Sequence, residues 1–384
     1  MNDWRGIRVR FLQAIADHFA LFSSGVKMNL RISFTVSLVL ASIGLISAQH
    51  YSAWVDQINH FYVFDEGAIT KLDHNLVKSF KVAKQYVAYV NNVGQLKIYE
   101  NGKAKVLFEN PPDEFHVTDN LLLFTTRGNM YVYEQGKITN LRFWGGGQYQ
   151  YYDSIVAFVD YNGNFRVYSN LESNAVEMLN VSNVTVGKNI VGYLNNMDQL
   201  IVYYRGEKQN LEVMTPTQMK AGRNLLAYVD YYKQFKVFHK GNVIQIGSFP
   251  PQSFETGDDL VAFVQPNGQF MVFDDGLPIE IEIQPPVNYW VKDNFVIYHD
   301  PGGSFKTYFK GQIHTLESYI PKFWACDNEV LAWIDYNGRI KAFYKGNMIY
   351  ASDRVVKKFD VWLDTITYPV GLDRPKIYWN GRIY

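Results

Sequence analysis

The chain has 384 residues, with 37 basic and 37 acidic side chains, and 47% of its residues are hydrophobic. That hydrophobic content excludes a disordered chain, and the balanced charge argues against an electrostatic nucleic-acid binder. Because Cys326 is the only cysteine, no disulfide can form within one chain. The aromatic content of 16% favours β-structure, since ring side chains fit the half-buried surface of a strand.

Residues 28–48 have the layout of a secretory signal peptide. Arg31 supplies the charge of a short leading region, an uncharged apolar run follows, and the run ends in small residues up to Ala48. The alternative is a single membrane anchor, because the run is nearly long enough to span a bilayer. We expect residues 1–48 to form an N-terminal extension and signal peptide, and residues 49–384 to form the mature domain without a membrane span.

The single cysteine also bears on the compartment. An exported chain with one thiol does not depend on oxidation for its stability. This fits a bacterial periplasm better than a eukaryotic secretory route. We therefore expect a periplasmic protein.

A pattern of about 35 residues recurs from residue 51 to the C-terminus. It is clearest in VAYVNNVGQLKIYENG (87–102), LVAFVQPNGQFMVFDDG (260–276) and VLAWIDYNGRIKAFYKG (330–346). Units close on a glycine, which stands at Gly67, Gly102, Gly136, Gly206, Gly241, Gly276, Gly311, Gly346 and Gly381. One unit lacks the glycine and has Ser169 to Asn174 in its place. The spacing predicts ten units, because a fixed repeat marks a solenoid or a propeller.

Each unit carries two positions that favour aromatic side chains. Three residues before the closing turn stand Phe64, Tyr99, Tyr133, Tyr168, Tyr203, Phe238, Phe273, Tyr308, Phe343 and Tyr378. The strand before it carries a second ring in nine units, at Trp54, Tyr89, Phe158, Tyr193, Tyr228, Phe263, Tyr298, Trp333 and Tyr368. A small residue usually precedes this second ring. Large beside small at adjacent positions predicts sheets that interdigitate with a neighbour on both sides.

Four short strands fit into each unit. In residues 252–284 these are QSFET, LVAFVQ, QFMVFDD and PIEIE, joined by tight turns that contain glycine. Longer links, several with proline, join one unit to the next. This plan resembles the β-propeller blade. The resemblance implies an all-β fold of about ten four-stranded antiparallel blades, and the alternative is an open solenoid of the same sheets.

The two ends of the repeat are irregular. The mature sequence begins two residues before the second strand of the first unit, so that unit has no residues for an innermost strand. The last strand is short, Arg382 to Tyr384. We therefore expect the ring to close by packing of one sheet face on another.

Few residues suggest chemistry. Asp56, Asp160, Asp230, Asp300 and Asp335 occupy one turn position, where a carboxylate is expected to cap backbone amides; calcium binding is the alternative, but the EF-hand spacing is absent. The eight histidines form no zinc motif, and no serine nucleophile motif or phosphate-binding loop is present. Cys326 is expected to be a buried apolar residue. We expect no enzymatic activity, no cofactor and no metal, although carboxylates brought together across blades would not be visible in the sequence.

One stretch breaks the repeat. It contains three glycines among aromatic residues, and we select it as the candidate partner-binding site: Phe143, Trp144, Gly145, Gly146, Gly147, Tyr149, Tyr151 and Tyr152. Aromatic side chains are enriched at binding hot spots. The alternative is a bulged inner strand whose rings fill space near the axis.

The overall style is similar to exported propellers of Bacteroidota-type bacteria, which are rich in tyrosine and asparagine. Within that group it is similar to the periplasmic plug-type subunit of the type IX secretion translocon. The resemblance implies a non-enzymatic scaffold that binds a protein partner, with a large outer-membrane barrel as the candidate, and implies no nucleic-acid partner. The alternative function is a carbohydrate-binding or carbohydrate-active propeller, in which aromatic faces stack on sugars.

Overall fold

The computed structural model describes residues 50–142, 148–179, 181–371 and 374–384. It divides into two compact units, residues 1–47 and 48–384, and all described residues belong to the second. The signal peptide expected at residues 28–48 lies outside the described part. Among the described residues, no helix is long and apolar enough to cross a membrane.

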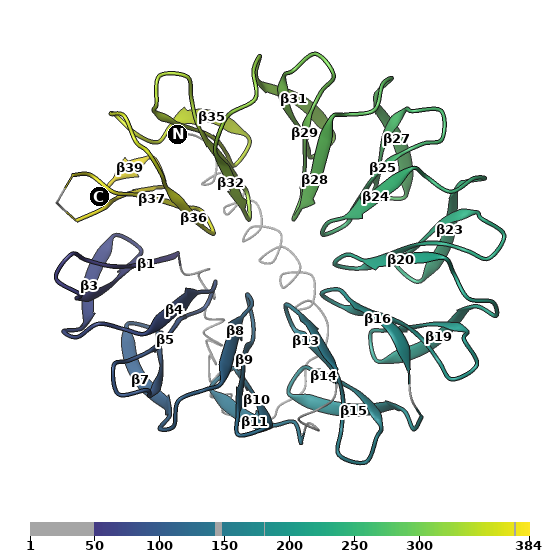
Figure 1. The fold of residues 1–384 in the computed structure, drawn as a ribbon, viewed down its shortest axis with the longest axis horizontal. Coiled ribbons are helices and arrows are strands. Elements are labelled where there is room, and N and C mark those ends of the chain that lie inside the picture. Colours follow the sequence, from purple (N-terminus) through teal and green to yellow (C-terminus); the bar gives the residue numbers. More distant parts are fainter. Residues whose placement is uncertain (1–49, 143–147, 180, 372–373) are drawn as a thin grey trace, which may run out of the picture. The chain divides into compact units, whose positions relative to one another are not determined.

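The second unit consists of ten antiparallel sheets, nine with four strands and one with three. The sheets stand around a common axis as the blades of a ring (Figure 1). We number the blades in chain order and call their strands inner, second, third and outer, counted from the axis. The predicted ten-bladed propeller is thereby confirmed.

The strands follow the repeat. The inner strands are β4 (Ser79–Val82), β8 (Glu114–Val117), β12 (Tyr149–Tyr152), β16 (Ser182–Val186), β20 (Gln218–Ala221), β24 (Ser253–Thr256), β28 (Asn288–Lys292), β32 (Trp324–Asp327) and β36 (Asp360–Trp362). The second strands are β1 (Tyr51–Val55), β5 (Val87–Val90), β9 (Leu122–Thr126), β13 (Ile155–Val159), β17 (Ile190–Leu194), β21 (Leu225–Val229), β25 (Leu260–Val264), β29 (Phe295–His299), β33 (Val330–Ile334) and β37 (Thr365–Tyr368).

The two remaining classes complete each blade. The third strands are β2 (Phe61–Asp65), β6 (Leu96–Glu100), β10 (Asn129–Glu134), β14 (Phe165–Ser169), β18 (Leu200–Tyr204), β22 (Phe235–His239), β26 (Phe270–Asp274), β30 (Phe305–Phe309), β34 (Ile340–Tyr344) and β38 (Lys376–Trp379). The outer strands are β3 (Ala68–Asp73), β7 (Lys103–Phe108), β11 (Lys137–Asn140), β15 (Glu172–Glu177), β19 (Glu207–Glu212), β23 (Asn242–Gly247), β27 (Leu277–Glu282), β31 (Gln312–Glu317), β35 (Asn347–Tyr350) and β39 (Arg382–Ile383).

The hydrophobic core lies between neighbouring blades. Second strands such as β25 are buried along their whole length, because a blade covers each of their faces. In one such layer Phe263 and Phe273 of blade 7 pack with Ala227 and Phe235 of blade 6. The small residue leaves room for the neighbour's ring, as the sequence predicts. All members of both predicted ring positions are buried.

Polar side chains join the same blades. The Tyr228 hydroxyl donates to Glu212 Oε1 of the preceding blade at 3.0 Å, and Lys236 Nζ approaches the same oxygen at 2.8 Å. Lys236 also pairs with Asp230 at 2.7 Å. The arrangement recurs two blades further on, between blades 7 and 8, at Tyr298, Glu282, Lys306 and Asp300. A buried hydroxyl therefore has an acceptor, and a carboxylate bridges two blades.

The turns between inner and second strands touch one another next to the axis. Arg223 N donates to the Asp258 carbonyl at 2.6 Å, and Asp258 N donates to the Asp293 carbonyl at 2.8 Å. Glycine makes this approach possible: a Cβ on Gly222 would lie 2.2 Å from the Gly257 carbonyl oxygen, and one on Gly187 would lie 1.6 Å from that of Gly222. The backbones of consecutive blades therefore meet without side chains between them.

Blades 1 and 10 close the ring. Ser52 Oγ lies 2.6 Å from Thr367 Oγ1, and the Phe64 ring packs 5.9 Å from that of Trp379 and 5.2 Å from that of Tyr384. These contacts join sheet faces, as expected, and they exclude the open solenoid. Blade 1 is the three-stranded sheet, with the order β1-β2-β3. Among the described residues its second strand, β1, is therefore the edge next to the axis.

Candidate protein-binding face

The two ends of the blades carry different loops. Each second strand runs towards the end where it turns into the third strand, and the links between blades start and finish at that same end. The turns from inner to second strand and from third to outer strand lie at the other end. Loops at one end therefore form one continuous face of the ring, which is the usual place for functional residues in a repeat fold.

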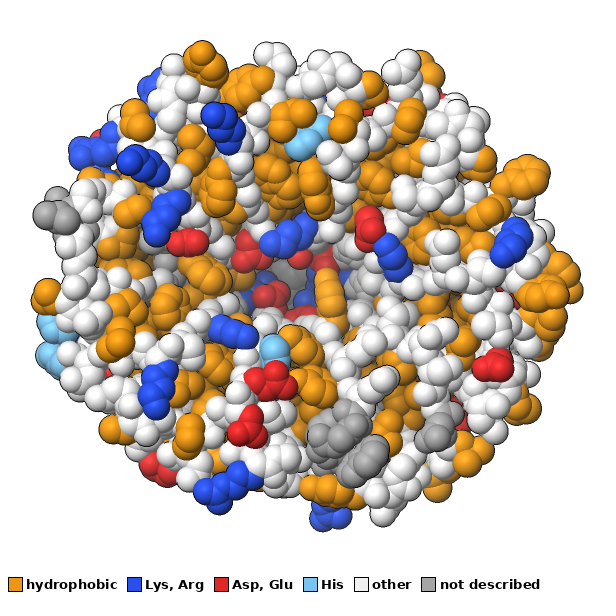
Figure 2. Space-filling model, in the orientation of Figure 1, with side chains coloured by type: hydrophobic (Ala, Val, Ile, Leu, Met, Phe, Trp, Pro, Cys, Tyr) orange, Lys and Arg blue, Asp and Glu red, His pale blue; other side chains and the backbone are white. Residues whose placement is uncertain are grey.

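The face formed by the turns from second to third strand and by the links between blades is rich in exposed hydrophobic side chains. We call it the apolar loop face. On the turns from second to third strand it exposes Ile58, Val93, Tyr161, Met197, Tyr231, Tyr232 and Tyr336. On the links between blades it exposes Leu76, Met178, Leu179, Val213, Met214, Phe249, Ile283, Val287, Ile320, Phe323 and Val355. Figure 2 shows this face, with hydrophobic side chains spread around the ring and charged side chains both around the central opening and along the rim.

The opposite face is polar. Among the described residues, none of its turns exposes a large hydrophobic side chain; Leu171 is half-buried and Leu363 is buried. Its turns carry charged pairs instead, such as Lys240 with Asp275 at 2.9 Å. Contiguous exposed apolar area marks interaction surfaces in soluble proteins. The contrast between the two faces therefore identifies the apolar loop face as the candidate site.

The predicted turn aspartates shape this face. Asp160 Oδ1 accepts the amides of Asn162 at 2.9 Å and Asn164 at 3.0 Å. Burial would raise the pKa of the Asp160 carboxyl, but these amide hydrogen bonds hold that pKa below its usual value. Tyr161, between Asp160 and the capped Asn162, is 55% exposed. Capping thus fixes the turn and directs the aromatic ring outwards.

The same capping occurs in the other predicted turns. Amides four residues further on donate to Asp56, Asp230, Asp300 and Asp335. Among the described residues, no group of three or more His, Cys, Asp or Glu side chains is arranged to hold a metal ion. The turn-capping interpretation of these aspartates therefore has direct support in the hydrogen bonds.

The candidate site selected from the sequence divides into two parts. Phe143, Trp144, Gly145, Gly146 and Gly147 lie outside the described residues. Tyr149, Tyr151 and Tyr152 belong to the inner strand β12. These rings therefore lie on a paired strand next to the axis.

Two of the three tyrosines bond to the preceding inner strand. The Tyr149 hydroxyl donates to Glu114 Oε1 at 2.5 Å, and the Tyr151 hydroxyl lies 2.8 Å from His116 Nδ1. The hydrogen bond from Tyr149 holds the pKa of Glu114 below its usual value. Tyr152 is 36% exposed. The structure thus brings Tyr149 and Tyr151 together with β8 and leaves Tyr152 apart from them.

Other residues considered in the sequence are structural. Cys326 is 4% exposed, and burial raises the pKa of its thiol far above its usual range. His239 and His299 are buried, and burial lowers the pKa of each. A neutral thiol and neutral imidazoles of this kind contribute packing.

Sequence reasoning missed the apolar loop face. Its residues are scattered at one or two per repeat, on turns whose polar and glycine neighbours indicate only a turn. The signal that would have found it is the comparison of loop classes: apolar residues recur after the capping Asp or Asn, and are absent from the closing-glycine turns.

The family of the chain follows from its sequence. Residues 45–384 match the family described as a 10-bladed beta propeller domain. The chain belongs to this family. No curated protein matches this chain.

Solved structures resemble the ten-bladed propeller only distantly. A computationally designed protein, Ika8, has 14% identity over 79% of this chain and 96% of its own, with a TM-score of 0.33. The CRINKLY WD40 ectodomain of the Arabidopsis thaliana receptor kinase ACR4 has 6% identity over 62% and 96%, with a TM-score of 0.33. PorZ, a type IX secretion component of Porphyromonas gingivalis, has 10% identity over 80% and 51%, with a TM-score of 0.32. Likenesses this low support no inference about function.

Proposed function

We propose that this ten-bladed propeller is an exported, non-enzymatic scaffold that binds another protein through its apolar loop face. The observation that carries the proposal is that the turns and links at one end of the blades expose many large hydrophobic side chains, whereas none of the described turns at the other end does. Apolar side chains exposed together gain free energy when a partner covers them, at roughly 25 cal/mol per Å². A ring presents such side chains over a broad area, which suits a protein partner better than a small ligand.

The proposed location is the periplasm, and the proposed partner is a large outer-membrane barrel such as the type IX secretion translocon. The predicted signal peptide and the single cysteine support export to a compartment where stability does not need disulfides. The similarity in style to the plug-type subunit of that system supports the partner. Closure of the ring by contacts between blades 1 and 10 supports a rigid body that could cover a pore.

A second candidate function is carbohydrate binding. Four tyrosines on turns of the apolar loop face are between 52% and 90% exposed, namely Tyr161, Tyr231, Tyr232 and Tyr336. Exposed aromatic rings of this kind stack on the apolar faces of sugars. In this case the exposed aliphatic residues of the links between blades would have no role, and for that reason we favour the protein partner.

Affinity capture from membranes of the source bacterium tests the proposal. The tagged full chain is expected to retain an outer-membrane barrel identified by mass spectrometry. A variant with Tyr232→Ser and Phe249→Ser removes two side chains that are 74% and 70% exposed, and it should lose that barrel while folding normally.

The matched control carries Lys240→Ser and Asp275→Ser, an exposed pair on the polar face of neighbouring blades. It should retain the barrel. Equal capture by both variants, or retention on a glycan resin with no barrel captured, would contradict the proposal.

A further inference from the structure

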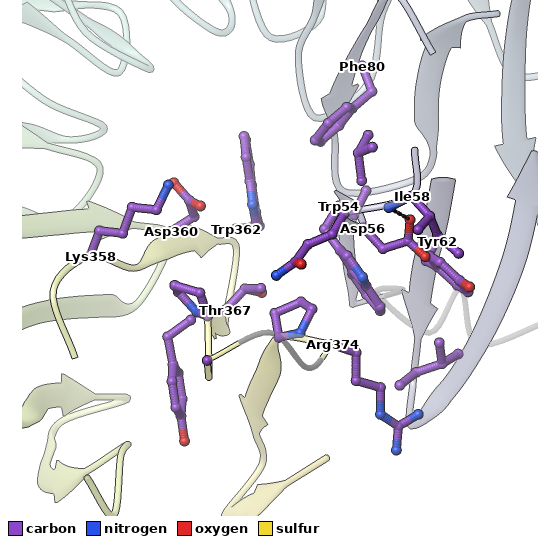
Figure 3. A pocket seen from close by; sticks show the side chains of 18 residues that line it. Trp54, Asp56, Ile58, Tyr62, Phe80, Lys358, Asp360, Trp362, Thr367 and Arg374 are labelled. Carbon is purple, nitrogen blue, oxygen red and sulfur yellow. Dashed lines mark hydrogen bonds between the residues drawn. The ribbon is translucent and has the colours of Figure 1, made fainter. Parts of the chain in front are cut away.

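Blade 1 leaves a strand-shaped gap next to the axis. Nine blades have an inner strand, and β1 has no neighbour on its inner side among the described residues. A cavity of about 920 Å³ lies at this edge. Side chains from three blades surround it: Trp54 of blade 1, Phe80 of blade 2 and Trp362 of blade 10 (Figure 3).

The backbone of β1 offers hydrogen bonds to this gap. Asp56 N donates to the His60 carbonyl, and residues of β1 pair with β2 in the same register. Bonding groups alternate along an antiparallel strand, so Ser52 and Trp54 bond to β2 while the N–H and C=O of Ala53 and Val55 point to the other side. Unpaired edge groups of this kind are a template for another strand.

One buried polar group at the gap also has no partner. Trp54 is 7% exposed, and its indole Nε1 has no hydrogen bond. This side chain lines the cavity. In blade 9 the equivalent Trp333 Nε1 donates to Glu317 at 2.9 Å, and this acceptor belongs to β31, the outer strand of the preceding blade. A buried donor without an acceptor is costly, and a ligand that supplies one relieves the cost.

The other blades show what fits the gap. Their inner strands are extended. In seven of these nine blades a large apolar side chain is paired with the ring of the second strand: Phe80 with Tyr89, Phe115 with Phe124, Tyr149 with Phe158, Met219 with Tyr228, Phe254 with Phe263, Tyr289 with Tyr298, and Trp324 with Trp333. Phe254 also packs 5.0 Å from Phe235, at the start of the preceding third strand. Around the gap the equivalent positions are Trp54 and Pro375, and both line the cavity.

We propose that this gap is a docking site for an extended segment of a partner protein, which pairs antiparallel to β1 and places an aromatic side chain opposite Trp54. Main-chain hydrogen bonds to Ala53 and Val55 supply affinity, and the cavity selects the side chain. A second copy of this chain is a poor occupant, because its own inner strands already belong to complete sheets. The inference rests on the proposed protein-binding role and assigns it a site distinct from the residues used to test the apolar loop face.

A synthetic peptide provides the probe. The segment PQSFETG, residues 251–257 of this chain, contains an inner strand with its aromatic residue, Phe254. A fluorescent copy is expected to bind the full chain at least about tenfold more tightly than a copy with Phe254→Ser, because the ring would be buried against Trp54. Hydrogen exchange should slow at the amides of Ala53 and Val55 when the peptide is bound.

Two variants locate the binding. Ala53→Pro removes an N–H that points to the gap and not to β2, so it should abolish binding. Trp54→Phe keeps the ring and removes only the indole donor, so it should fold even if the proline variant does not, and should weaken binding by about threefold to tenfold.

The variant with Tyr232→Ser and Phe249→Ser should bind the peptide normally although it loses the membrane barrel, so the two proposals fail independently. Equal binding of the two peptides, unchanged exchange at Ala53 and Val55, or no binding would overturn the strand site. The last result includes the case in which residues before His50 or a second copy already fill the gap.

Discussion

At the scale of single residues, the fold depends on polar groups that bond across blades. Tyr308, in the third strand of blade 8, is 1% exposed and donates to Asp274 Oδ2 of blade 7 at 2.7 Å. Burial raises the pKa of Tyr308 above its usual range, and the hydrogen bond to this carboxylate is the second cause. The same position bonds to the preceding blade at Tyr99 and Tyr168. The ring position therefore combines packing with a specific hydrogen bond.

Tyr308→Phe keeps the ring and removes the hydroxyl. We expect the free energy of unfolding to fall by about 1 to 3 kcal/mol, because a hydrogen bond to a charged acceptor is lost. Urea denaturation measures the change. Tyr232→Phe, at a side chain that is 74% exposed, is the control and should leave stability unchanged. Equal effects of the two substitutions would show that the bond contributes nothing.

One carboxyl near the axis gives stability a pH dependence. Burial raises the pKa of Asp293 to about 6, with further contributions from the charges of Asp327 and Asp258. Its unfolded value is about 4, so the folded state binds the proton more tightly. This contribution to stability is present below about pH 4 and is lost as the pH rises through about 6.

Asp293→Asn keeps a neutral side chain at every pH, and its carbonyl oxygen can still accept the Asn328 amide. We expect the variant to unfold at a higher temperature than the parent at about pH 7.5, and at nearly the same temperature at about pH 4. Thermal unfolding at both pH values measures this. Asp275→Asn is the control, because Asp275 is exposed and its hydrogen bond from Lys240 lowers its pKa, whereas burial raises that of Asp293. A difference between Asp293→Asn and the parent that does not change with pH would refute the explanation.

At the scale of elements, the turns from inner to second strand set how closely blades approach one another. Gly187, Gly222 and Gly257 occupy equivalent positions in blades 5, 6 and 7, and each faces a backbone carbonyl of the next blade. The amide of Arg223 bonds to that next turn. Main chain against main chain fixes the rotation between these blades more strictly than side-chain packing alone, since side chains have rotamers to adjust.

Gly222→Ala tests this contact. Its Cβ would lie 2.2 Å from the Gly257 carbonyl oxygen, which is backbone and cannot rotate away. We expect a loss of about 3 kcal/mol in the free energy of unfolding, at the upper end for overpacking. Gly302→Ala is the control, because its Cβ would lie 3.3 Å from the nearest atom, a carboxylate oxygen of Asp300. Similar urea midpoints for both variants would contradict the role of Gly222.

At the scale of the whole molecule, closure turns a linear array into a ring. An open repeat array frays from its ends, whereas a closed ring has no free end. The contact that closes it is built from Trp54 and Phe64 of blade 1 and Ile377 of blade 10. Blade 1 is the blade that has three strands in place of four. The seam and the strand gap therefore lie in the same place.

Phe64→Ala tests closure. We expect a loss of about 3 to 5 kcal/mol, as for other large-to-small changes of buried rings. Hydrogen exchange should become faster first in blades 1 and 10, because only they lose a neighbour. Phe273→Ala, at the same repeat position inside the ring, is the control and should accelerate exchange around blades 6 and 7. Acceleration spread equally over all blades in both variants would contradict a seam.

The repeat in the sequence determined the fold class, the number of blades and the buried ring positions, because a period of 35 residues and alternating large and small residues depend on local chemistry. The roles of Asp160 and Cys326 were also predictable, since a turn cap and a buried thiol depend on near neighbours.

Only the tertiary structure decided the rest. Whether the ring closes depends on contacts such as Ser52 with Thr367, which lie 315 residues apart in the chain. The apolar loop face arises because single residues from many turns reach the same end of the blades. The gap beside β1 is visible only against its neighbours in space. Local patterns specify one blade, whereas the rotation accumulated over all blades determines which surfaces meet and which stay open.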